Sequence, residues 1–167
     1  MSETVRIAGH GTWELHDEDG LLVARGAFTN LVTTVGDTMY AERGAGIANL
    51  NTPTGMRLGT GLTEPSKAGA GAAIGSYVTG SARAFDNGYP IASTAGSALR
   101  ITYRVTWPAG VATATAIAEA VITNENPLTD TAGTEANTIA RVLLRPGIDK
   151  AGGQPFTLTL NHDQQGS

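Results

Sequence analysis

Alternating apolar and polar residues run through much of the chain and predict strands. Residues 98–107 give the clearest case, because five apolar side chains alternate there with arginine and threonine. Strict alternation of this length is typical of a strand with one buried face. Residues 111–123 form a second long apolar segment after a turn at residues 108–110. We therefore expect the two segments to pair as the central hairpin of a sheet.

Another hairpin is expected near the start of the chain. Trp13 and Leu15 alternate with polar residues, an acidic turn ending in Gly20 follows, and an apolar run begins at Leu21. Asp-Gly before an apolar run favours a tight turn, because glycine tolerates positive φ. Further strands are predicted at residues 55–59, 74–85, 137–145 and 156–161, with turns at residues 86–88 and 145–147.

One helix is predicted, at residues 31–43. Asn30 precedes it and is a suitable cap, because its side-chain oxygen can accept a hydrogen bond from a free amide of the first turn. Gly44 follows it, at the position where a left-handed glycine would end the helix. The apolar residues at helical spacing are Leu31, Val35, Met39 and Tyr40.

These elements together predict a mainly β protein. About seven to nine strands, turns at fairly regular intervals and one short helix fit an antiparallel β-sandwich or jelly-roll-like fold. An α/β fold would need crossover helices, which the pattern does not supply. A length of 167 residues supports one core, so residues 1–167 are expected to form a single domain, with residues 1–10 as a candidate N-terminal arm.

Composition and charge narrow the classes of function. The chain has no cysteine, which excludes disulfides, cysteine-ligated zinc, iron–sulfur clusters and thiol catalysis. Only 16% of the residues are charged and the net charge is −4, so the basic footprint of a nucleic-acid-binding protein is missing. No apolar run is long enough for a membrane span, and residues 1–10 lack the pattern of a secretion signal. We expect neither nucleic acid nor a membrane as a partner.

Motifs for catalysis, cofactors and metals are weak. The glycine-rich residues 69–75 depart from the G-x-G-x-x-G spacing, and no helix pattern follows them. There is no G-x-S-x-G motif, and nothing in the sequence assigns His162 to a catalytic triad. The candidate metal ligands are His10, His16, Asp17 and Asp19. A solvated acidic turn is favoured over a weak metal site there. We expect a protein that is not an enzyme and that holds no cofactor or metal.

Arginine supplies nine of the eleven basic residues. Its planar guanidinium binds carboxylates through two hydrogen bonds and keeps its charge when desolvated, which suits subunit interfaces. Arg100 and Arg104 share a face of one predicted strand. Arg141 and Arg145 share a face of another. These four arginines are the candidate interface residues, and the alternative is an ordinary polar sheet face.

Three further residues have both a structural and a functional interpretation. Glu119 lies within an apolar strand segment and needs a cationic partner if it is buried. The candidate partners are Arg100, Arg104 and Arg141. A structural or interface salt bridge is favoured over a catalytic acid. Trp13 and Trp107 occupy apolar positions of alternating strands, so a place in the core is favoured over an exposed platform for sugars.

Several segments follow a recognisable order: an N-L-V-T segment, a short helix, an L-G-T-G loop, β-hairpins and a final strand. They are Phe28–Asp37, Tyr40–Arg43, Met56–Gly61, Ala118–Ile122, Asn137–Arg141 and Thr157–His162. In this order, from residue 20 to residue 162, the chain resembles small accessory structural proteins of tailed-bacteriophage virions. That group includes both capsid decoration proteins and minor tail proteins. The matching motifs are structural and carry no catalytic signature.

The resemblance implies a β-sandwich that self-associates, as a trimer or another homo-oligomer, on the particle surface after synthesis in the host cytoplasm. The expected function is a capsid decoration or cement subunit that binds the major capsid protein and stabilises the shell. The alternative is a minor tail or tail-tip protein bound to tail proteins, and a stand-alone glycan-binding module is the third hypothesis. Loops at residues 44–54, 60–73 and 124–136 are expected to become ordered against neighbouring subunits.

Overall fold

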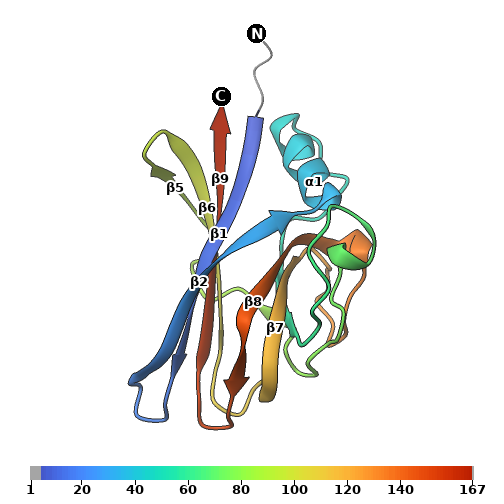
Figure 1. Ribbon diagram of the computed structural model, residues 1–167. Helices are drawn as coiled ribbons and strands as arrows, with labels where there is room; N and C mark the ends of the chain where they lie inside the picture. Colours follow the sequence, from blue (N-terminus) through green and yellow to red (C-terminus); the bar gives the residue numbers. More distant parts are fainter. Residues whose placement is uncertain (1–4, 167) are drawn as a thin grey trace.

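Nine strands joined edge to edge form a single sheet in the computed structural model, which describes residues 5–166 (Figure 1). Strand accounts for 49% of the residues and helix for 11%, so the predicted mainly β class with one α-helix is confirmed. The strand order is β4-β3-β7-β8-β2-β1-β9-β6-β5, and every neighbouring pair is antiparallel. The elements are β1 (Val5–His16), β2 (Leu22–Val32), α1 (Thr34–Gly44), β3 (Gly55–Gly59), η1 (Gly69–Ala72), β4 (Arg83–Ala84), β5 (Ile91–Ala95), β6 (Ala98–Trp107), β7 (Ala114–Thr123), η2 (Glu135–Asn137), β8 (Thr138–Lys150) and β9 (Phe156–Gly166).

The sheet curls where β2 meets β8. β2 pairs with β1 over most of its length, but it pairs with β8 only through residues 30–32. Beyond this short ladder the two strands separate, which leaves one part made of β2-β1-β9-β6-β5 and another made of β8-β7-β3-β4 (Figure 1). Both parts contribute side chains to a single apolar cluster, so the core lies between their inner faces. α1 packs beside the β2–β8 ladder, mainly against β8.

The two tryptophans lie in this core, as predicted. Trp107 is 0% exposed and stacks on Phe156 with ring centroids 5.7 Å apart. Its indole N–H donates to the carbonyl of Ser81 at 2.8 Å, so its one polar group is satisfied. Trp13 is 9% exposed and packs on the same phenylalanine at 6.2 Å. Both rings therefore stabilise the contact between strands and neither offers a surface platform.

The N-terminal segment lies within the sheet. Residues 5–10 of the candidate arm belong to β1 and pair with β9, while residues 1–4 lie outside the described residues. The predicted N-terminal hairpin is confirmed: β1 pairs with β2, and Gly20 adopts a φ of 80° in the turn. Among the helices of residues 5–166, none is long and apolar enough to cross a membrane.

The predicted central hairpin is wrong, although its first strand is right. β6 occupies residues 98–107 and β3 occupies residues 55–59, both as predicted. However, β6 pairs with β5 and β9, whereas β7 pairs with β3 and β8. The segment between β6 and β7 carries the chain from one part of the sheet to the other, with positive φ at Gly110 and Ala112. Alternation shows which face of a strand is buried, but it does not show which strand lies beside it.

Two other strand predictions need correction. In residues 74–85 only the two residues of β4 form a named strand. The rest is loop apart from one isolated antiparallel bridge between Tyr77 and Gly59 of β3, and the amides of Gly75 and Ser76 donate to the buried carboxylate of Glu119. The sequence predicted that the strand at residues 137–145 ends in a turn at residues 145–147, but β8 continues through these residues to Lys150. Pro146 lies where the β2 ladder has ended and the β7 ladder is irregular, so its missing N–H removes no regular ladder bond.

The helix begins later than predicted. Thr33, not Asn30, caps it, because the Thr33 hydroxyl accepts from the Gly36 amide at 3.1 Å. Leu31 continues β2 and pairs with β8, so the ladder decides where the helix can start. The left-handed glycine after the helix is Gly46, with a φ of 72°, two residues beyond the predicted one.

Candidate functional site

A polar face covers the outer side of the part of the sheet formed by β2, β1, β9 and β6. Strand register places alternate side chains of all four strands on this side, away from the core. Six threonines lie on it: Thr12, Thr29, Thr102, Thr106, Thr157 and Thr159. Arg100 and Arg104 project among them from β6. We call this surface the threonine face.

Arg100 is held in place by Asp163 of β9. Its Nε donates to Oδ1 at 2.7 Å and its Nη2 donates to Oδ2 at 2.8 Å, which is a bidentate pair. Hydrogen bonding from Arg100 lowers the pKa of the Asp163 carboxyl, so the carboxylate stays charged in this pair. The His10 ring lies beside them, with Nδ1 3.9 Å from Asp163. The Arg100 side chain remains 30% exposed, so part of a fixed guanidinium faces solvent.

Arg104 is positioned by different partners. Its Nε lies 3.2 Å from Asp86 Oδ2, an ion pair without hydrogen-bond geometry at that nitrogen. Asp86 is itself fixed, because it accepts from the Thr106 amide at 2.9 Å and from the Thr106 hydroxyl at 2.7 Å. The Arg104 guanidinium lies over the Tyr89 ring at 5.6 Å. With 42% of its side chain exposed, Arg104 presents free N–H donors at a defined place.

A shallow polar hollow of about 240 Å³ lies beside Arg104 on the threonine face. It is lined by Thr12, Glu14, Arg104, Thr157 and Thr159. Hydroxyls, one carboxylate and one guanidinium give this surface both donors and acceptors. Such a surface suits hydrogen bonding to the backbone and polar side chains of another protein.

Arg141 lies inside the chain. Its Nε and Nη2 donate to Glu119 Oε2 at 3.1 and 2.7 Å, and both side chains are 0% exposed. The prediction that Glu119 pairs with an arginine is thus confirmed, and Arg141 is the partner rather than Arg100 or Arg104. Because the pair is fully buried, the structure places Arg141 in the fold of the chain and not on a surface open to another subunit.

The buried pair orders the loop at residues 60–76. The Glu119 carboxylate accepts from the amides of Gly61 at 2.9 Å, Gly75 at 3.0 Å and Ser76 at 2.9 Å. Arg141 Nη1 donates to the Thr63 carbonyl at 2.5 Å. Charged groups that accept or donate several hydrogen bonds hold a backbone strongly. This loop is therefore ordered by its own chain, without a neighbouring subunit.

Arg57 of β3 orders the loop that follows β7 through its own hydrogen bonds. The sequence analysis did not identify this residue. Its side chain is 1% exposed, forms an ion pair with Glu125, and donates to Thr123 Oγ1 at 2.7 Å and to the Thr129 carbonyl at 3.3 Å. Burial would raise the pKa of Glu125, but hydrogen bonds from Thr129 and the Arg57 charge outweigh it and lower that pKa. A lone arginine within a short apolar strand between glycines was the only signal in the sequence.

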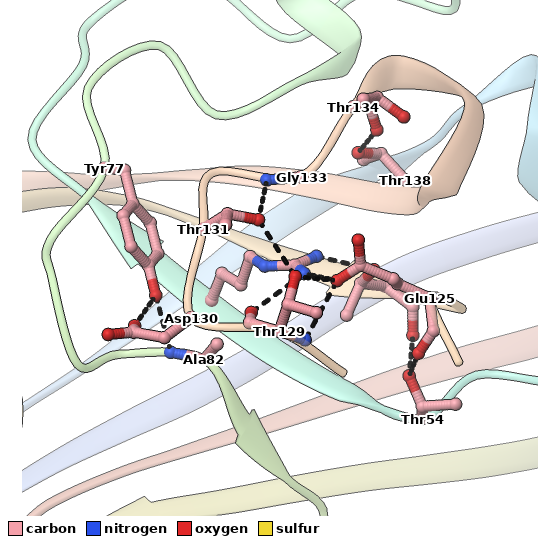
Figure 2. Close-up of polar contacts among 12 residues, drawn as sticks. Thr54, Tyr77, Ala82, Glu125, Thr129, Asp130, Thr131, Gly133, Thr134 and Thr138 are labelled. Atoms are coloured by element: carbon pink, nitrogen blue, oxygen red, sulfur yellow. Dashed lines mark hydrogen bonds and ion pairs between the residues drawn. The ribbon is translucent and has the colours of Figure 1, made fainter. Parts of the chain in front are cut away.

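The same loop is tied to the segment before β4. Figure 2 shows the Tyr77 hydroxyl turned toward the Asp130 carboxylate, to which it donates, and also toward the Ala82 amide, from which it accepts at 3.1 Å. Asp130 also accepts from the Gly80 amide at 2.8 Å. Thr54 donates to the Glu125 carbonyl at 2.8 Å on the other side of the loop (Figure 2). The long loops therefore form a connected covering over the outer side of β3 and β7.

His162 belongs to a buried polar network that joins α1 to the sheet. Its Nδ1 lies 2.7 Å from Tyr40 Oη, and its Nε2 lies 2.9 Å from the amide nitrogen of Asn30. Tyr40 Oη is 2.8 Å from Tyr103 Oη. Since an amide N–H donates to Nε2, the ring is neutral with its proton on Nδ1. Burial lowers the pKa of His162 to about 4 and raises the pKa of Tyr103 to about 12.

Arg145, the fourth predicted interface residue, lies at the surface. Its side chain is 61% exposed and forms an ion pair with Glu64. The pair lies at a hollow of about 260 Å³ where β2 and β8 separate, lined in part by Phe28 and Leu143. Exposed ion pairs of this kind contribute little stability, so the guanidinium remains available to a partner.

The candidate metal residues do not come together. Within residues 5–166 no group of three His, Cys, Asp or Glu side chains could hold a metal ion. Asp17 instead accepts from the amides of Asp19 at 3.0 Å and Leu21 at 2.8 Å, as expected for an acidic turn.

Comparison of the chain with protein-family models, curated proteins and solved structures finds no match.

Proposed function

We propose that this chain is a structural subunit of a tailed-bacteriophage virion, a decoration or cement protein that binds the major capsid protein on the particle surface. The order of segments from residue 20 to residue 162 supports this family. The main support is structural. Arg100 and Arg104 both lie on the threonine face, and each is half-exposed and held by an aspartate. We also propose that the two parts of the sheet form a β-sandwich and that the chain has no enzymatic role.

The fixed arginines favour binding to a protein surface. A guanidinium that is already held in one geometry loses less conformational entropy when it meets a carboxylate or carbonyl of a partner. The surrounding threonines add hydroxyl donors and acceptors without net charge. A sheet face of this kind matches a flat, repeated surface better than it matches a small ligand.

Stabilisation of the shell follows from mass action. A subunit that binds only the expanded lattice shifts the equilibrium toward that lattice, as any ligand of one state does. Many copies add many modest contacts, particularly when the subunits also associate with one another. The buried charges of Glu119 and Arg141 hold the loop at residues 60–76, and Arg57 holds the loop after β7, so these two loops need no neighbouring subunit to become ordered. Ordering of the loop at residues 44–54 on assembly stays a prediction.

A minor tail or tail-tip protein is the second candidate, because the same family resemblance covers both locations. The two differ in copy number per particle rather than in any residue of the chain. The glycan-binding hypothesis rested on exposed tryptophans, and both tryptophans are buried. That observation leaves the hypothesis without its sequence support.

The test is reconstitution of the subunit onto expanded shells that lack it. We expect Arg100→Glu combined with Arg104→Glu to reduce occupancy of the shell strongly, while Arg83→Glu, an exposed arginine on β4, leaves occupancy unchanged. Arg104→Glu alone is included, because reversal at Arg100 also removes the pair with Asp163. Circular dichroism and thermal unfolding show whether each variant is folded. Wild-type occupancy by the folded Arg104→Glu and double variants would contradict the proposal.

A further inference from the structure

Strand β5 forms an exposed edge of the sheet. It pairs with β6 on one side, and no strand of residues 5–166 lies on its other side (Figure 1). Residues 91–94 are exposed and Ala95 is half-buried, so no loop covers this edge. An uncovered edge presents unpaired backbone N–H and C=O groups to which another extended segment can add.

β5 lacks the features that usually protect an edge strand. Monomeric proteins interrupt such edges with charged side chains, prolines or bulges. The chain has no charged residue between Asp86 and Arg100, and Pro90 lies before β5 rather than within it. The β5–β6 ladder has no register shift. The nearest cation, Arg100, is already paired with Asp163. β5 is therefore a regular and neutral template for pairing.

The free edges of β4, β2 and β8 do not complement β5, and the free side of β1 at residues 5–8 carries the charged Arg6. β4, at the opposite end of the sheet, contains only Arg83 and Ala84 and carries an exposed charge. The free sides of β2 and β8 flank the hollow where the sheet divides, with the ion pair of Glu64 and Arg145 at its rim. The edge that matches β5 in length and neutrality is β5 itself, so a second copy of this chain fits it best.

We propose that β5 pairs antiparallel with β5 of a second copy, about a twofold axis at Ser93. In this register Ile91 lies opposite the partner's Ala95, and Ala92 lies opposite the partner's Thr94. No charges meet and most of the side chains are small, so the pairing is free of repulsion. Leu99 is 62% exposed and is the ladder partner of Thr94, so pairing places further apolar surface beside it.

Because both copies use the same edge, the contact closes as a dimer and leaves no free β5. Pairing through β5 gives a surface for the self-association that the family resemblance implies. The dimer forms from the isolated chain, so its test does not depend on a virion. The dimerisation test and the shell-binding test are independent, so a negative result in one does not contradict the proposal tested by the other.

The absence of cysteine allows a direct test by crosslinking. In the Ser93→Cys variant the two thiols lie opposite each other, and opposite residues of an antiparallel pair have Cα atoms about 4.5–5.5 Å apart, within disulfide range. Ser97→Cys is the matched control, because Ser97 is also exposed but sits in the β5–β6 turn. In the proposed register the two copies of Ser97 lie beyond opposite ends of the β5–β5 ladder, well outside disulfide range. We expect the disulfide dimer of Ser93→Cys to form at least about tenfold faster. Equal rates would overturn the proposal.

A charge placed at the same position gives an independent measurement. Ser93→Lys sets two lysines directly opposite each other, whereas Ser97→Lys adds the same charge away from the axis. In sedimentation equilibrium we expect a dimer of the wild-type chain, an increase of about tenfold or more in the dissociation constant for Ser93→Lys, and no change for Ser97→Lys. Circular dichroism shows that the variants are folded. A wild-type chain that stays monomeric, or a Ser93→Lys dimer as stable as wild type, would contradict the inference.

Discussion

The Glu119 carboxylate on β7 lies 2.7 Å from the Arg141 guanidinium on β8, and neither side chain is exposed. The same carboxylate accepts from backbone amides of residues 61, 75 and 76, which belong to a loop far from it in sequence. A buried charge pair is tolerated when its remaining hydrogen-bonding groups are satisfied, and here the loop satisfies them. One ion pair thus joins two central strands to the covering of the sheet.

Replacing Glu119 is expected to destabilise the chain strongly. Glu119→Gln removes the charge that balances Arg141 and turns an amide NH₂ toward backbone donors. Loss of one partner from a buried pair costs about 3–5 kcal/mol, because the other charge stays buried and unpaired. The free energy of unfolding in urea measures the effect. Glu64→Gln, in the exposed pair with Arg145, is the control and should cost less than about 1 kcal/mol. Similar losses for the two variants would show that the buried pair is unimportant.

Replacing Arg57 is expected to loosen one loop and not the whole chain. Arg57→Leu removes the cation that holds Glu125 and the Thr129 carbonyl, so amides in residues 124–134 should exchange with solvent faster. Hydrogen exchange followed by mass spectrometry resolves this segment. The matched control is Arg83→Leu, which removes an exposed arginine and should leave exchange unchanged. Unchanged exchange of residues 124–134 in Arg57→Leu would mean that other contacts hold the loop.

Stability is expected to fall between pH 6.5 and pH 4 because of His162. Its pKa is lowered from 6.5 to about 4 in the folded chain, so the unfolded chain binds the proton first as the pH falls. The contribution is present above pH 6.5 and is lost toward pH 4, at about 1.4 kcal/mol for each unit of the shift, or roughly 3 kcal/mol in total. Tyr40, Tyr103, Asp163 and His10 are the other titratable groups that face or flank this ring.

Urea unfolding at several pH values tests this expectation. His162→Gln should flatten the dependence of stability between pH 6.5 and pH 4, whatever its effect on stability at pH 7. His16→Gln, which changes an imidazole outside the network, should keep the wild-type dependence. Asp163 has a lowered pKa as well, so its own contribution is lost only at more acidic pH than that of His162. A wild-type slope in His162→Gln would assign the pH dependence to other groups.

Local features of the fold were readable from the sequence because local pattern determines them. Strict alternation located β6 at residues 98–107, and the short strand predicted at residues 55–59 is β3. The burial of Trp107 followed from its place on the apolar side of an alternating strand. Pairing of Glu119 with an arginine followed from the cost of burying a single charge.

Features that depend on long-range contacts were not readable. The helix start was misplaced because pairing of Leu31 with β8 overrides the local cap at Asn30. Arg57 and His162 were missed as structural groups, since single polar residues in apolar strands have no periodicity. Of the four predicted interface arginines, Arg141 is buried, while Arg100, Arg104 and Arg145 remain accessible to a partner.

Counting copies of the chain in purified virions tests the proposed function most directly. Gel densitometry against the major capsid protein gives the ratio. A cement subunit occupies symmetry-related sites over the whole shell, so we predict hundreds of copies per particle. Fewer than about twenty copies would contradict the cement assignment in favour of a tail protein, and absence of the chain from virions would contradict a virion role altogether.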